Sequence, residues 1–444
     1  MAMGRRKPKQ QGLWVSADEI VKPTSHPFYA KMNAVLDDNK FDRKVEHLCR
    51  RFYRPVKGRP SLAPGAYFRL LLIGYCEGID SERGIAWRVA DSLSLREFLG
   101  FGVTEQTPDH STISRTRRLY TLEAHKAVFQ WCVRVLASAG LLDAQTVAID
   151  ATTLEANAAM RSIRRRDDGR KYEEYLKGLA EAEGVENPTR EQLARMDRKR
   201  KKKASNKEWT SPSDPDARIA KMKDGRTHLA HKAEHAVDLA SGALVAVTLQ
   251  GADQGDTATV HETLAEVQAN ARLVNERGVE EVVADKGYHS GAGLVKLHGE
   301  SVRSYIPEPA RGRRKWQGRE TEQARVYANR RRVQGRRGKQ LQKARSELVE
   351  RSFAHLYETG GMRRTHLRKT DNILKRLLIH AVGFNLALMI RKAHGIGKPR
   401  TLQGVQDRLL FVQILVMAVY AAEWESTGRQ RERAATGGQD ELAA

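Results

Sequence analysis

Two apolar, β-rich runs that each end in an aspartate constrain the fold of this chain more than any other feature. Residues 146–149 (TVAI) lead into Asp150, and residues 282–284 (VVA) lead into Asp285. Short runs of β-branched and apolar residues bounded by polar ones are typical of buried strands. We therefore expect two strands, each of which ends in a carboxylate.

A third carboxylate, Glu350, lies inside an amphipathic helical pattern that runs from residue 341 to residue 356. Two strand-end aspartates and a helical glutamate offer the hard oxygen ligands that Mg²⁺ prefers. Two such ions about 4 Å apart can activate an attacking oxygen and stabilise a leaving one at a phosphodiester. Glu347 is a rival third ligand, but it precedes Arg351 by four residues, which favours a helical ion pair.

The order of the other patterns predicts a mixed α/β (α+β) core. A long helix precedes the strand at 146, and a hairpin follows over residues 229–250, where Gly242 lies in the turn. Further along, the sequence predicts helices at 259–273 and 290–297 and strands at 279–285 and 302–306. A mixed sheet of about five strands flanked by helices matches the ribonuclease-H-like architecture.

The composition shifts divide the chain into segments. We expect an N-terminal arm, an all-helical domain, a catalytic core in three pieces, two insertions that supply no core strand, and a C-terminal helix with a disordered tail. The apolar stretch 409–422 is expected to be a packing or dimer helix. The boundaries are 1–57 for the arm, 58–143 for the helical domain, 144–160, 226–310 and 341–395 for the core, 161–225 for a charged helical insertion, 311–340 for a basic insertion, and 396–444 for the C-terminal segment.

The helical domain offers one candidate DNA-binding element. Residues 107–112 give a strong N-cap signal ahead of a polar and basic helix that begins near Ile113. This geometry suits a helix-turn-helix. A purely structural helical bundle is an equally good interpretation, since the helix-turn-helix has no sharp sequence signature.

The charge of the chain indicates a polyanionic partner. The net charge is +24, from 78 Lys and Arg against 54 Asp and Glu. Residues 311–345 hold 14 basic and 2 acidic residues, and Trp316 and Tyr327 are interleaved with them, as in nucleic-acid-binding grooves. Trp316 could stack on an unpaired base or pack its own insertion. The basic run 198–203 is either a DNA contact or a solvated charge run.

The remaining composition favours a reducing cytosol. The three cysteines form no C-x-x-C pair, and their odd number fits a reducing compartment. The N-terminal residues 1–11 are basic without a following apolar core, so we expect no secretory signal. We also expect no membrane association, because the apolar stretch 409–422 is too short to span a bilayer.

Three stretches of the chain resemble the bacterial insertion-sequence transposases with a DDE catalytic core, of the IS-five-like superfamily. They are VAIDATT around Asp150, ADKGY around Asp285, and LVERSFAHL around Glu350. The resemblance covers most of residues 45–395, and the helical segment 58–120 is similar to the N-terminal domain of that group. Relatives often carry a Tyr and an Arg before the glutamate; here Arg345 precedes Glu350 by five residues, and no Tyr stands one turn before Arg345.

The resemblance implies a ribonuclease-H-like fold and metal-dependent cleavage at the element ends, followed by strand transfer into target DNA. It implies Asp150, Asp285 and Glu350 as catalytic and metal-binding residues, with two Mg²⁺ or Mn²⁺ ions. We expect the partners to be the terminal inverted repeats, the target DNA and at least one more copy of the chain, in a cytoplasmic, nucleoid-associated protein. The alternatives are a related nuclease without strand transfer and an inactive DNA-binding remnant. The residues expected to contact DNA are Lys286, Arg313, Arg314, Lys315, Trp316, Arg330, Arg331, Arg345 and Arg351.

Overall fold

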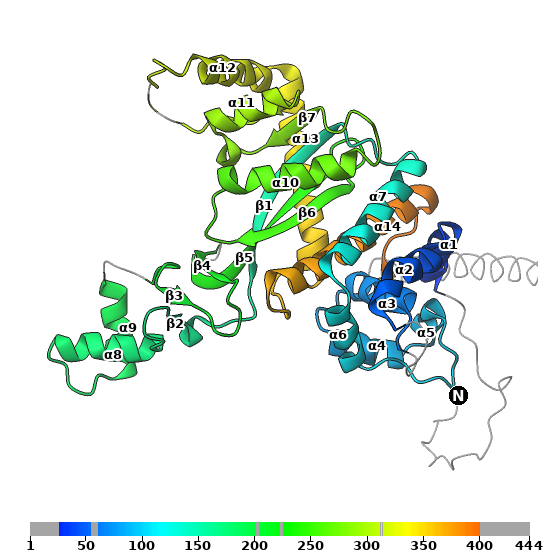
Figure 1. Ribbon diagram of the computed structural model, residues 1–444, viewed down its shortest axis with the longest axis horizontal. Helices are drawn as coiled ribbons and strands as arrows, with labels where there is room; N and C mark the ends of the chain where they lie inside the picture. Colours follow the sequence, from blue (N-terminus) through cyan, green and yellow to red (C-terminus); the bar gives the residue numbers. More distant parts are fainter. Residues whose placement is uncertain are drawn as a thin grey trace, which may run out of the picture.

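A mixed sheet lies at the centre of the protein (Figure 1). The computed structural model describes residues 26–54, 61–200, 204–222, 225–310, 312 and 314–399. The sheet has six strands in the order β4-β5-β1-β7-β8, and β6 also pairs with β5. The strands are β1 (Thr146–Glu155), β4 (Arg218–Lys221), β5 (Thr227–Asp238), β6 (Leu244–Gly251), β7 (Glu281–Ala284) and β8 (Arg303–Tyr305).

The central strand β1 has one antiparallel and one parallel neighbour. It pairs with β5 over nine residues, with Asp150 opposite His235. On its other side it runs parallel to β7, where Ile149 is in register with Ala284. The apolar runs 147–149 of β1 and 282–284 of β7 are fully buried. The two apolar runs that the sequence marks thus pair with each other inside the sheet, as expected for strands covered on both faces.

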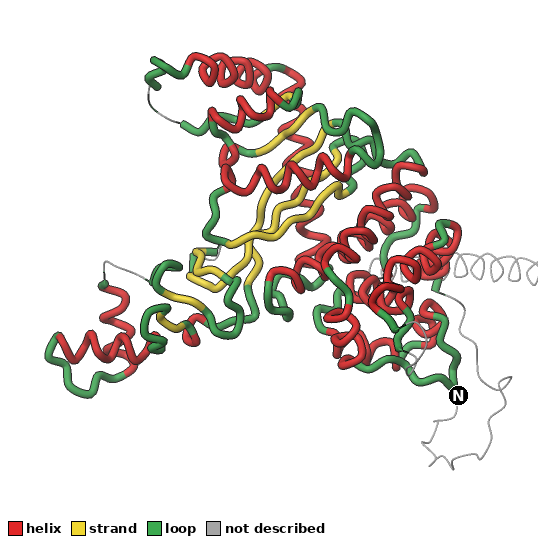
Figure 2. The backbone as a smooth tube through the Cα atoms, viewed as in Figure 1, coloured by secondary structure: helices red, strands yellow, loops and turns green. Residues whose placement is uncertain are grey.

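Helices cover the two faces of the sheet. α10 (Asp256–Ala271) packs on β6 and on the face of β5 that carries Glu234, whose carboxylate accepts hydrogen bonds from Thr259 and Thr263 of α10. α13 (Arg336–Phe353) crosses β7, β1 and β5 on the opposite face and continues into a π-helical turn, η4 (Ala354–Glu358). The tube view in Figure 2 shows the strands enclosed between these helices.

The helical region packs against the sheet through α14 (Thr370–His394), which contacts α3, α7 and β6. The Asn385 side chain bonds both backbone groups of Leu244 in β6, at 2.8 and 2.9 Å. The buried residues of helices and sheet form one continuous core. The N-terminal helices are α1 (Pro27–Asp38), α2 (Phe41–Cys49), α3 (Pro64–Glu77), α4 (Glu82–Ala90), α5 (Leu93–Leu99), α6 (His110–Leu119) and α7 (Leu122–Ser138).

Helices α1 and α2 belong to this helical unit, although we expected residues 1–57 to form a separate arm. Phe28, Met32 and Phe41 are almost completely buried against the helices that follow. Large apolar side chains of this kind each contribute about 1.5–3 kcal/mol when buried. The predicted arm residues 1–25 and residues 400–444 of the C-terminal segment, including 409–422, lie outside the described residues.

α14 is the one helix among the described residues that is long and apolar enough to cross a membrane. However, 89% of its apolar window is buried inside the protein. Its partners α3, α7 and β6 cover it from several sides. The apolar composition of α14 is thus explained by its place in the core.

The first insertion differs from the helical segment expected over residues 161–225. It does contain two helices, α8 (Tyr172–Ala182) and α9 (Arg190–Lys199), which form an arm with its own small core. It also contains the short strands β2 (Arg164–Arg165) and β3 (Trp209–Thr210), and β4, which pairs with β5. The expectation that no core strand arises here was wrong, because the free edge of residues 227–230 is completed by β4.

The second insertion, predicted over residues 311–340, is also partly core. It contains α12 (Glu320–Gln334), and α13 already begins at Arg336. Val326 is fully buried, and the Asn329 side chain bonds the backbone N–H and carbonyl of Ile306 at 3.1 and 2.7 Å. α12 packs against α11 (Gly291–Gly299) and covers β8. Deleting the segment would expose the edge of the sheet.

We predict that Asn329→Ala lowers the free energy of unfolding by about 2–4 kcal/mol, because two buried backbone groups of Ile306 lose their partners. Urea unfolding followed by circular dichroism measures the effect. Gln334→Ala, at an exposed position on the same helix, is the control and should change stability by about 0.5 kcal/mol or less. Equal stability of both variants would contradict a core role for α12.

Candidate active site

Asp150 lies in the middle of β1, whereas the sequence placed it at a strand end. The strand continues for five residues because the antiparallel partner β5 extends beside it. The parallel partner β7 ends at Ala284, in register with Ile149. Asp150 is therefore the first residue of β1 beyond the end of β7. Because Ile149 pairs with Ala284, the next residues of the two chains, Asp150 and Asp285, lie side by side.

The Asp150 carboxylate is partly buried and forms an ion pair with the Arg345 side chain. One oxygen accepts a hydrogen bond from the Ala151 N–H at 2.8 Å, and the other contacts Nη1 of Arg345 at 2.5 Å. Burial raises the pKa of Asp150, and the nearby charge of Asp285 raises it further, while the Arg345 guanidinium opposes both effects. Two neighbouring carboxylates and one bound arginine make a site that favours additional positive charge.

Asp285 ends β7 and caps the short 3₁₀ turn η3 (Lys286–Tyr288). Its Oδ1 accepts the Gly287 N–H at 2.7 Å. A Cβ on Gly287 would overlap the carboxylate of Asp256, so a side chain at this position would displace that carboxylate. Lys286 is exposed beside the carboxylate. The loop thus fixes Asp285 tightly and leaves Lys286 open to a ligand.

Glu350 lies on α13, which crosses the sheet above Asp150. Val349 and Ser352 of this helix are buried against the sheet, while Glu350 is exposed and forms no hydrogen bond or ion pair with any described residue. Glu347 pairs with Arg351 at 2.6 Å, as the four-residue spacing predicted. Of the two glutamates, Glu350 is the one that remains free to take a new partner.

The structure thus brings Asp150 and Asp285 together but does not enclose a metal site. Across the described ranges, no three His, Cys, Asp or Glu side chains gather closely enough to hold an ion. The oxygen donors still fit a divalent cation, because Asp150 lies beside Asp285, the Arg345 guanidinium pairs with Asp150 alone, and Glu350 lies unpaired on the helix above them. Hard oxygen ligands of this kind suit Mg²⁺ or Mn²⁺.

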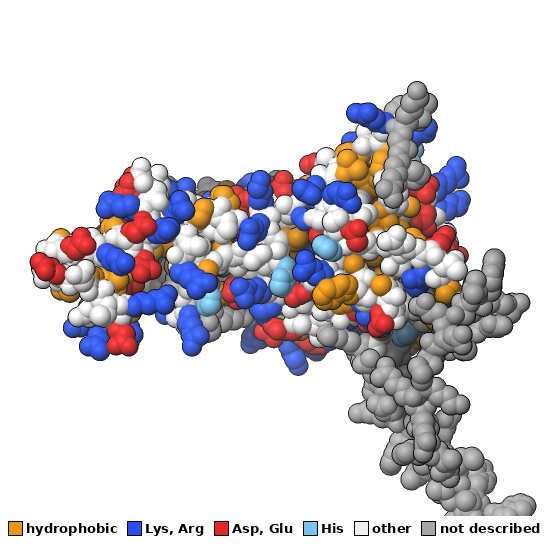
Figure 3. Space-filling model, turned by 90° about the horizontal axis from the view of Figure 1, so that it is seen from below, with side chains coloured by type: hydrophobic (Ala, Val, Ile, Leu, Met, Phe, Trp, Pro, Cys, Tyr) orange, Lys and Arg blue, Asp and Glu red, His pale blue; other side chains and the backbone are white. Residues whose placement is uncertain are grey.

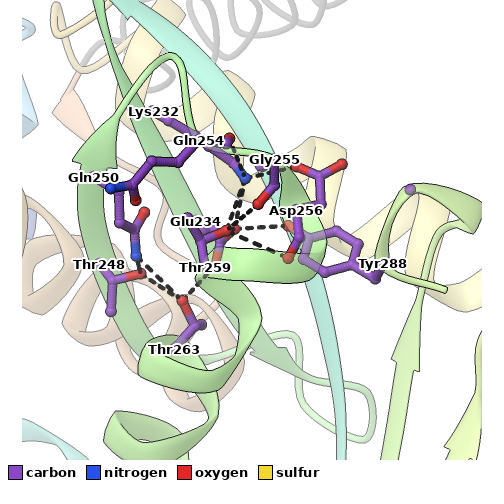
Figure 4. A network of polar contacts seen from close by, with 12 residues as sticks. Lys232, Glu234, Thr248, Gln250, Gln254, Gly255, Asp256, Thr259, Thr263 and Tyr288 are labelled. Atoms are coloured by element: carbon purple, nitrogen blue, oxygen red, sulfur yellow. Dashed lines mark hydrogen bonds and ion pairs between the residues drawn. The ribbon is translucent and has the colours of Figure 1, made fainter. Parts of the chain in front are cut away.

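A buried ionic network supports Asp285 from the α10 side of the sheet (Figure 4). Lys232 of β5 pairs with Glu234 at 3.0 Å and with Asp256 at 2.6 Å, and it donates to Thr259 at 2.8 Å. Glu234 is fully buried. It also accepts a hydrogen bond from the Tyr288 hydroxyl at 3.2 Å. The network therefore ties the end of the Asp285 loop to the centre of the sheet.

Burial and the carboxylates of Glu234, Asp256 and Asp150 raise the pKa of Tyr288 well above its usual value. The phenol consequently keeps its proton and remains a donor to Glu234. Glu234 and Asp238 of β5 are both almost fully buried, so neither carboxylate is solvated. Lys232 and Asp256 were missed, although the period of two along β5 places Lys232 and Glu234 on one face.

Two histidines of β5, His231 and His235, are buried and bonded to other side chains. His231 contacts Asp214 at 3.0 Å in a fully buried pair. His235 contacts the hydroxyls of Ser352 at 2.8 Å and Tyr357 at 2.6 Å. Burial lowers the pKa of His235 to about 3, so its ring is neutral. His235 therefore anchors the last turn of α13 and η4 to the sheet.

The residues expected to contact DNA divide into paired and open groups. Arg314 and Arg330 both pair with Glu308, at 3.0 and 2.7 Å. The Trp316 ring packs edge-on against Tyr327 at 6.0 Å, with the Arg314 guanidinium 5.5 Å from its centre. Arg345 contacts Asp150, Arg351 pairs with Glu347, and Arg313 lies outside the described residues. Lys286, Lys315 and Arg331 are exposed.

The described surface carries basic side chains well beyond these positions. In the space-filling view of Figure 3, Lys and Arg side chains extend from the α8–α9 arm to the helical domain, with acidic side chains among them. α6, the helix considered for a helix-turn-helix, is capped by Asp109 and exposes Arg115 and Arg118. Its inner face packs on α4, where Arg117 pairs with Glu82 at 2.7 Å.

The mixed sheet flanked by helices has the arrangement of the ribonuclease-H-like class of polynucleotidyl transferases. Residues 141–386, more than half of the chain, match the family described as Transposase DDE domain. Residues 15–119 match a second family, described as Transposase domain (DUF772). The chain belongs to the DDE transposase family and is a DNA transposase. Proteins of this family bind DNA and depend on divalent metal.

A search of curated proteins gave no match to this chain. The two family matches confirm the insertion-sequence transposase class that the three motifs predicted. They do not distinguish subgroups, so the similarity to the IS-five-like group stays a prediction.

We predict that Glu234→Ala destabilises the fold by about 3–5 kcal/mol, because it leaves a buried charged network without one member. Tyr288→Phe should cost less, about 1.5–3 kcal/mol for one hydrogen bond to a charged group. Urea unfolding measures both. Glu173→Ala, at an exposed position on α8, is the control. If Glu234→Ala and the control had the same free energy of unfolding, the network would not contribute to the stability of the fold.

Proposed function

We propose that Asp150, Asp285 and Glu350 are the catalytic carboxylates of this transposase. The observation that carries the proposal is the β1–β7 register, which brings Asp150 beside Asp285 while α13 crosses directly above. Glu350 is the free carboxylate on that helix, whereas Glu347 is held by Arg351. The family match over residues 141–386, which includes all three carboxylates, supports the same assignment.

These carboxylates would hold two Mg²⁺ or Mn²⁺ ions. Such ions supply an activated nucleophile and stabilise the charge on the leaving oxygen during in-line displacement. The residues of the chain do the rest: Asp150 and Asp285 present adjoining oxygens from rigid strands, and the Tyr288–Glu234 contact keeps Asp285 in place. The reactions expected are cleavage at the ends of the element and transfer of the freed 3′-hydroxyl to target DNA.

The contacts of Arg345 suggest that it exchanges Asp150 for a DNA phosphate when metal and DNA bind. It is mostly buried, with 14% of its side chain exposed, and it contacts Asp150 directly. Its Nε also donates to Gln342 at 3.2 Å, and Gln342 in turn bonds the carbonyls of Ala284 and Tyr305. In the absence of metal the guanidinium neutralises Asp150; with metal and DNA bound, we propose that it contacts a phosphate next to the cut.

The remaining basic residues define the proposed DNA path. Lys286, Lys315 and Arg331 are open to a phosphate, and Arg313 belongs with them by sequence. Three arginines are paired with glutamates: Arg314 and Arg330 with Glu308, and Arg351 with Glu347. To contact DNA, each would have to exchange its carboxylate partner for a phosphate. Trp316 packs on Tyr327, so a base-stacking role requires that it leave this ring.

The roles of the larger segments are also proposals. We propose that the helical unit that contains α6 binds the terminal inverted repeats. The α8–α9 arm extends from the catalytic core (Figure 1). Pairing two element ends calls for at least a dimer of this chain in the DNA complex. We propose that the protein acts in the cytoplasm on nucleoid DNA.

The first test compares two glutamates on one helix. We predict that Asp150→Asn, Asp285→Asn and Glu350→Gln each reduce end cleavage at least about 1,000-fold, because the site loses metal-ligand charge. Glu347→Gln is the matched control and should retain near-normal activity. The assay uses a duplex with the element's own ends and Mg²⁺, and DNA binding is measured in parallel. Normal cleavage by Glu350→Gln together with loss in Glu347→Gln would reverse the assignment.

The same reaction separates the transposase from the alternative of a nuclease without strand transfer. Joined products between the element end and a target plasmid are expected for transposition. Cleavage without any joined product, in the presence of target DNA, would favour the nuclease. The absence of both, with normal DNA binding, would favour an inactive remnant.

We also predict that Arg345→Gln binds Mn²⁺ more tightly than the wild type when DNA is absent, by roughly tenfold. The reason is that a charged hydrogen bond worth about 1.5 kcal/mol no longer competes for Asp150. Isothermal titration calorimetry measures the affinity without any reaction. Arg363→Gln removes an exposed arginine that pairs with Glu358 and serves as the control. Weaker Mn²⁺ binding by Arg345→Gln would contradict the competition.

A further inference from the structure

A small basic pocket lies at the far edge of the sheet, outside the site described above. Its volume is about 290 Å³. It is formed where α11 and α12 meet the outer strand β8, in the upper part of Figure 1. Leu294 and Val302 supply its apolar lining. The polar residues that line it are His298, Ser301, Arg303, Ser304, Arg325 and Arg332.

The charge of this pocket is not compensated within the protein. Arg303, Arg325 and Arg332 form no ion pair with any carboxylate in the described part of the chain, and no acidic residue lines the pocket. Nearby arginines behave differently: Arg330 pairs with Glu308, and Arg337 pairs with Glu281. Arg331 of the same helix also lacks a carboxylate partner, but it is exposed and does not line the pocket. The pocket differs because three arginines without carboxylate partners line one space that has no acidic residue.

Arg332 is held rigidly at the back of the pocket. Its Nε donates to the Ser304 carbonyl and its Nη2 to the Ser304 hydroxyl, both at 3.0 Å. Burial lowers the pKa of Arg332, and the charges of Arg303 and Arg325 lower it further. Capping the free edge of β8 explains Arg332. It does not explain why two more arginines converge on the same space.

We propose that this pocket binds a backbone phosphate of the DNA that flanks the cleavage position. A phosphate is the anion that three converging guanidinium groups recognise best, through charge-assisted hydrogen bonds. The fixed Arg332 pre-organises the pocket, and Arg303 and Arg325 close on the ligand. The proposal rests on the proposed function, because it extends the DNA path from the active site to α12.

The position of the pocket fits a contact several nucleotides from the cut. Arg303 is in register with Glu281 at the start of β7, while Asp285 follows the end of the same strand. Along the strand direction, the four residues from Glu281 to Asp285 separate Arg303 from Asp285 by about 13 Å. This corresponds to roughly four steps of a DNA strand at about 3.4 Å each.

The test is the salt dependence of DNA binding by the double variant Arg303→Gln/Arg325→Gln. Full-length Asp150→Asn protein is used in EDTA, so that neither metal nor cleavage enters the measurement. We expect roughly tenfold weaker binding of the element-end duplex in 150 mM salt. We also expect the slope of log affinity against log salt to fall in magnitude by about one to two, since each phosphate contact contributes about 0.9.

The matched control is Arg195→Gln/Arg277→Gln, which removes the same charge from exposed positions on α9 and beside β7. In this control, the slope of log affinity against log salt should fall by less than half of the decrease expected for Arg303→Gln/Arg325→Gln. Equal effects of the two double variants would show a general charge effect and overturn the proposal. Thermal unfolding checks that each variant is folded; if the double variant is not, Arg303→Gln alone, at an exposed position, should lower the slope by about one.

Two further arms identify the ligand. Duplexes are shortened stepwise on each side of the cleavage position, and the deficit of the variant should vanish once the DNA no longer reaches the pocket. A deficit that persists on the shortest duplexes would overturn the placement. Inorganic phosphate is titrated separately: binding that depends on Arg303 and Arg325, without any effect on DNA, would mark a small-anion site and also overturn the proposal.

The result is independent of the catalytic assignment. Binding is measured in protein that lacks the Asp150 carboxylate, so an error in the triad leaves the expected slopes unchanged. Conversely, normal DNA binding by Arg303→Gln/Arg325→Gln would remove the pocket from the DNA path without affecting the cleavage test of Asp150, Asp285 and Glu350.

Discussion

The parallel pairing of β1 with β7 is the constraint on which the rest of the structure depends. The two strands meet over only four residues, and β7 then ends while β1 continues along β5. This difference in length leaves Asp150 inside a strand and Asp285 at the start of a loop, side by side. The charge of each carboxylate acts on the other, which is why the Arg345 guanidinium lies against Asp150.

The sequence allowed the main elements of the catalytic core to be predicted, because each has a local pattern. The apolar runs before Asp150 and Asp285, the hairpin around Gly242 and the amphipathic helix that carries Glu350 all lie where expected. Strand length was less accessible: the charged Asp150 interrupts the apolar run, and the local sequence does not show that β5 pairs with β1 as far as Glu155. Long-range pairing thus decided where β1 ends.

The two insertions illustrate a second limit. Residues 311–340 look like a solvated basic segment, since their composition hides the few positions that face inward. Val326 and Asn329 lie three residues apart on one face of α12, and that short stripe suffices to cover β8. Likewise, nothing local in residues 218–221 predicts that they complete the edge of β5. The Lys232–Glu234–Asp256 network was only partly accessible: Lys232 and Glu234 share one face of β5, but Asp256 comes from α10 and meets them only in the folded protein.

Strand β5 carries none of the proposed catalytic carboxylates, yet two consecutive residues on it hold the elements that do. Glu234 points to one face and binds Tyr288 at the end of the Asp285 loop, while His235 points to the other and binds Ser352 at the end of the Glu350 helix. The alternation of side chains along a strand makes a single dipeptide the common anchor of both layers. An internal deletion that removed residues 227–238 would leave every acidic residue of the triad in the chain and still abolish their arrangement. A count of the DDE residues alone therefore overestimates how many degraded copies of such an element retain a working site.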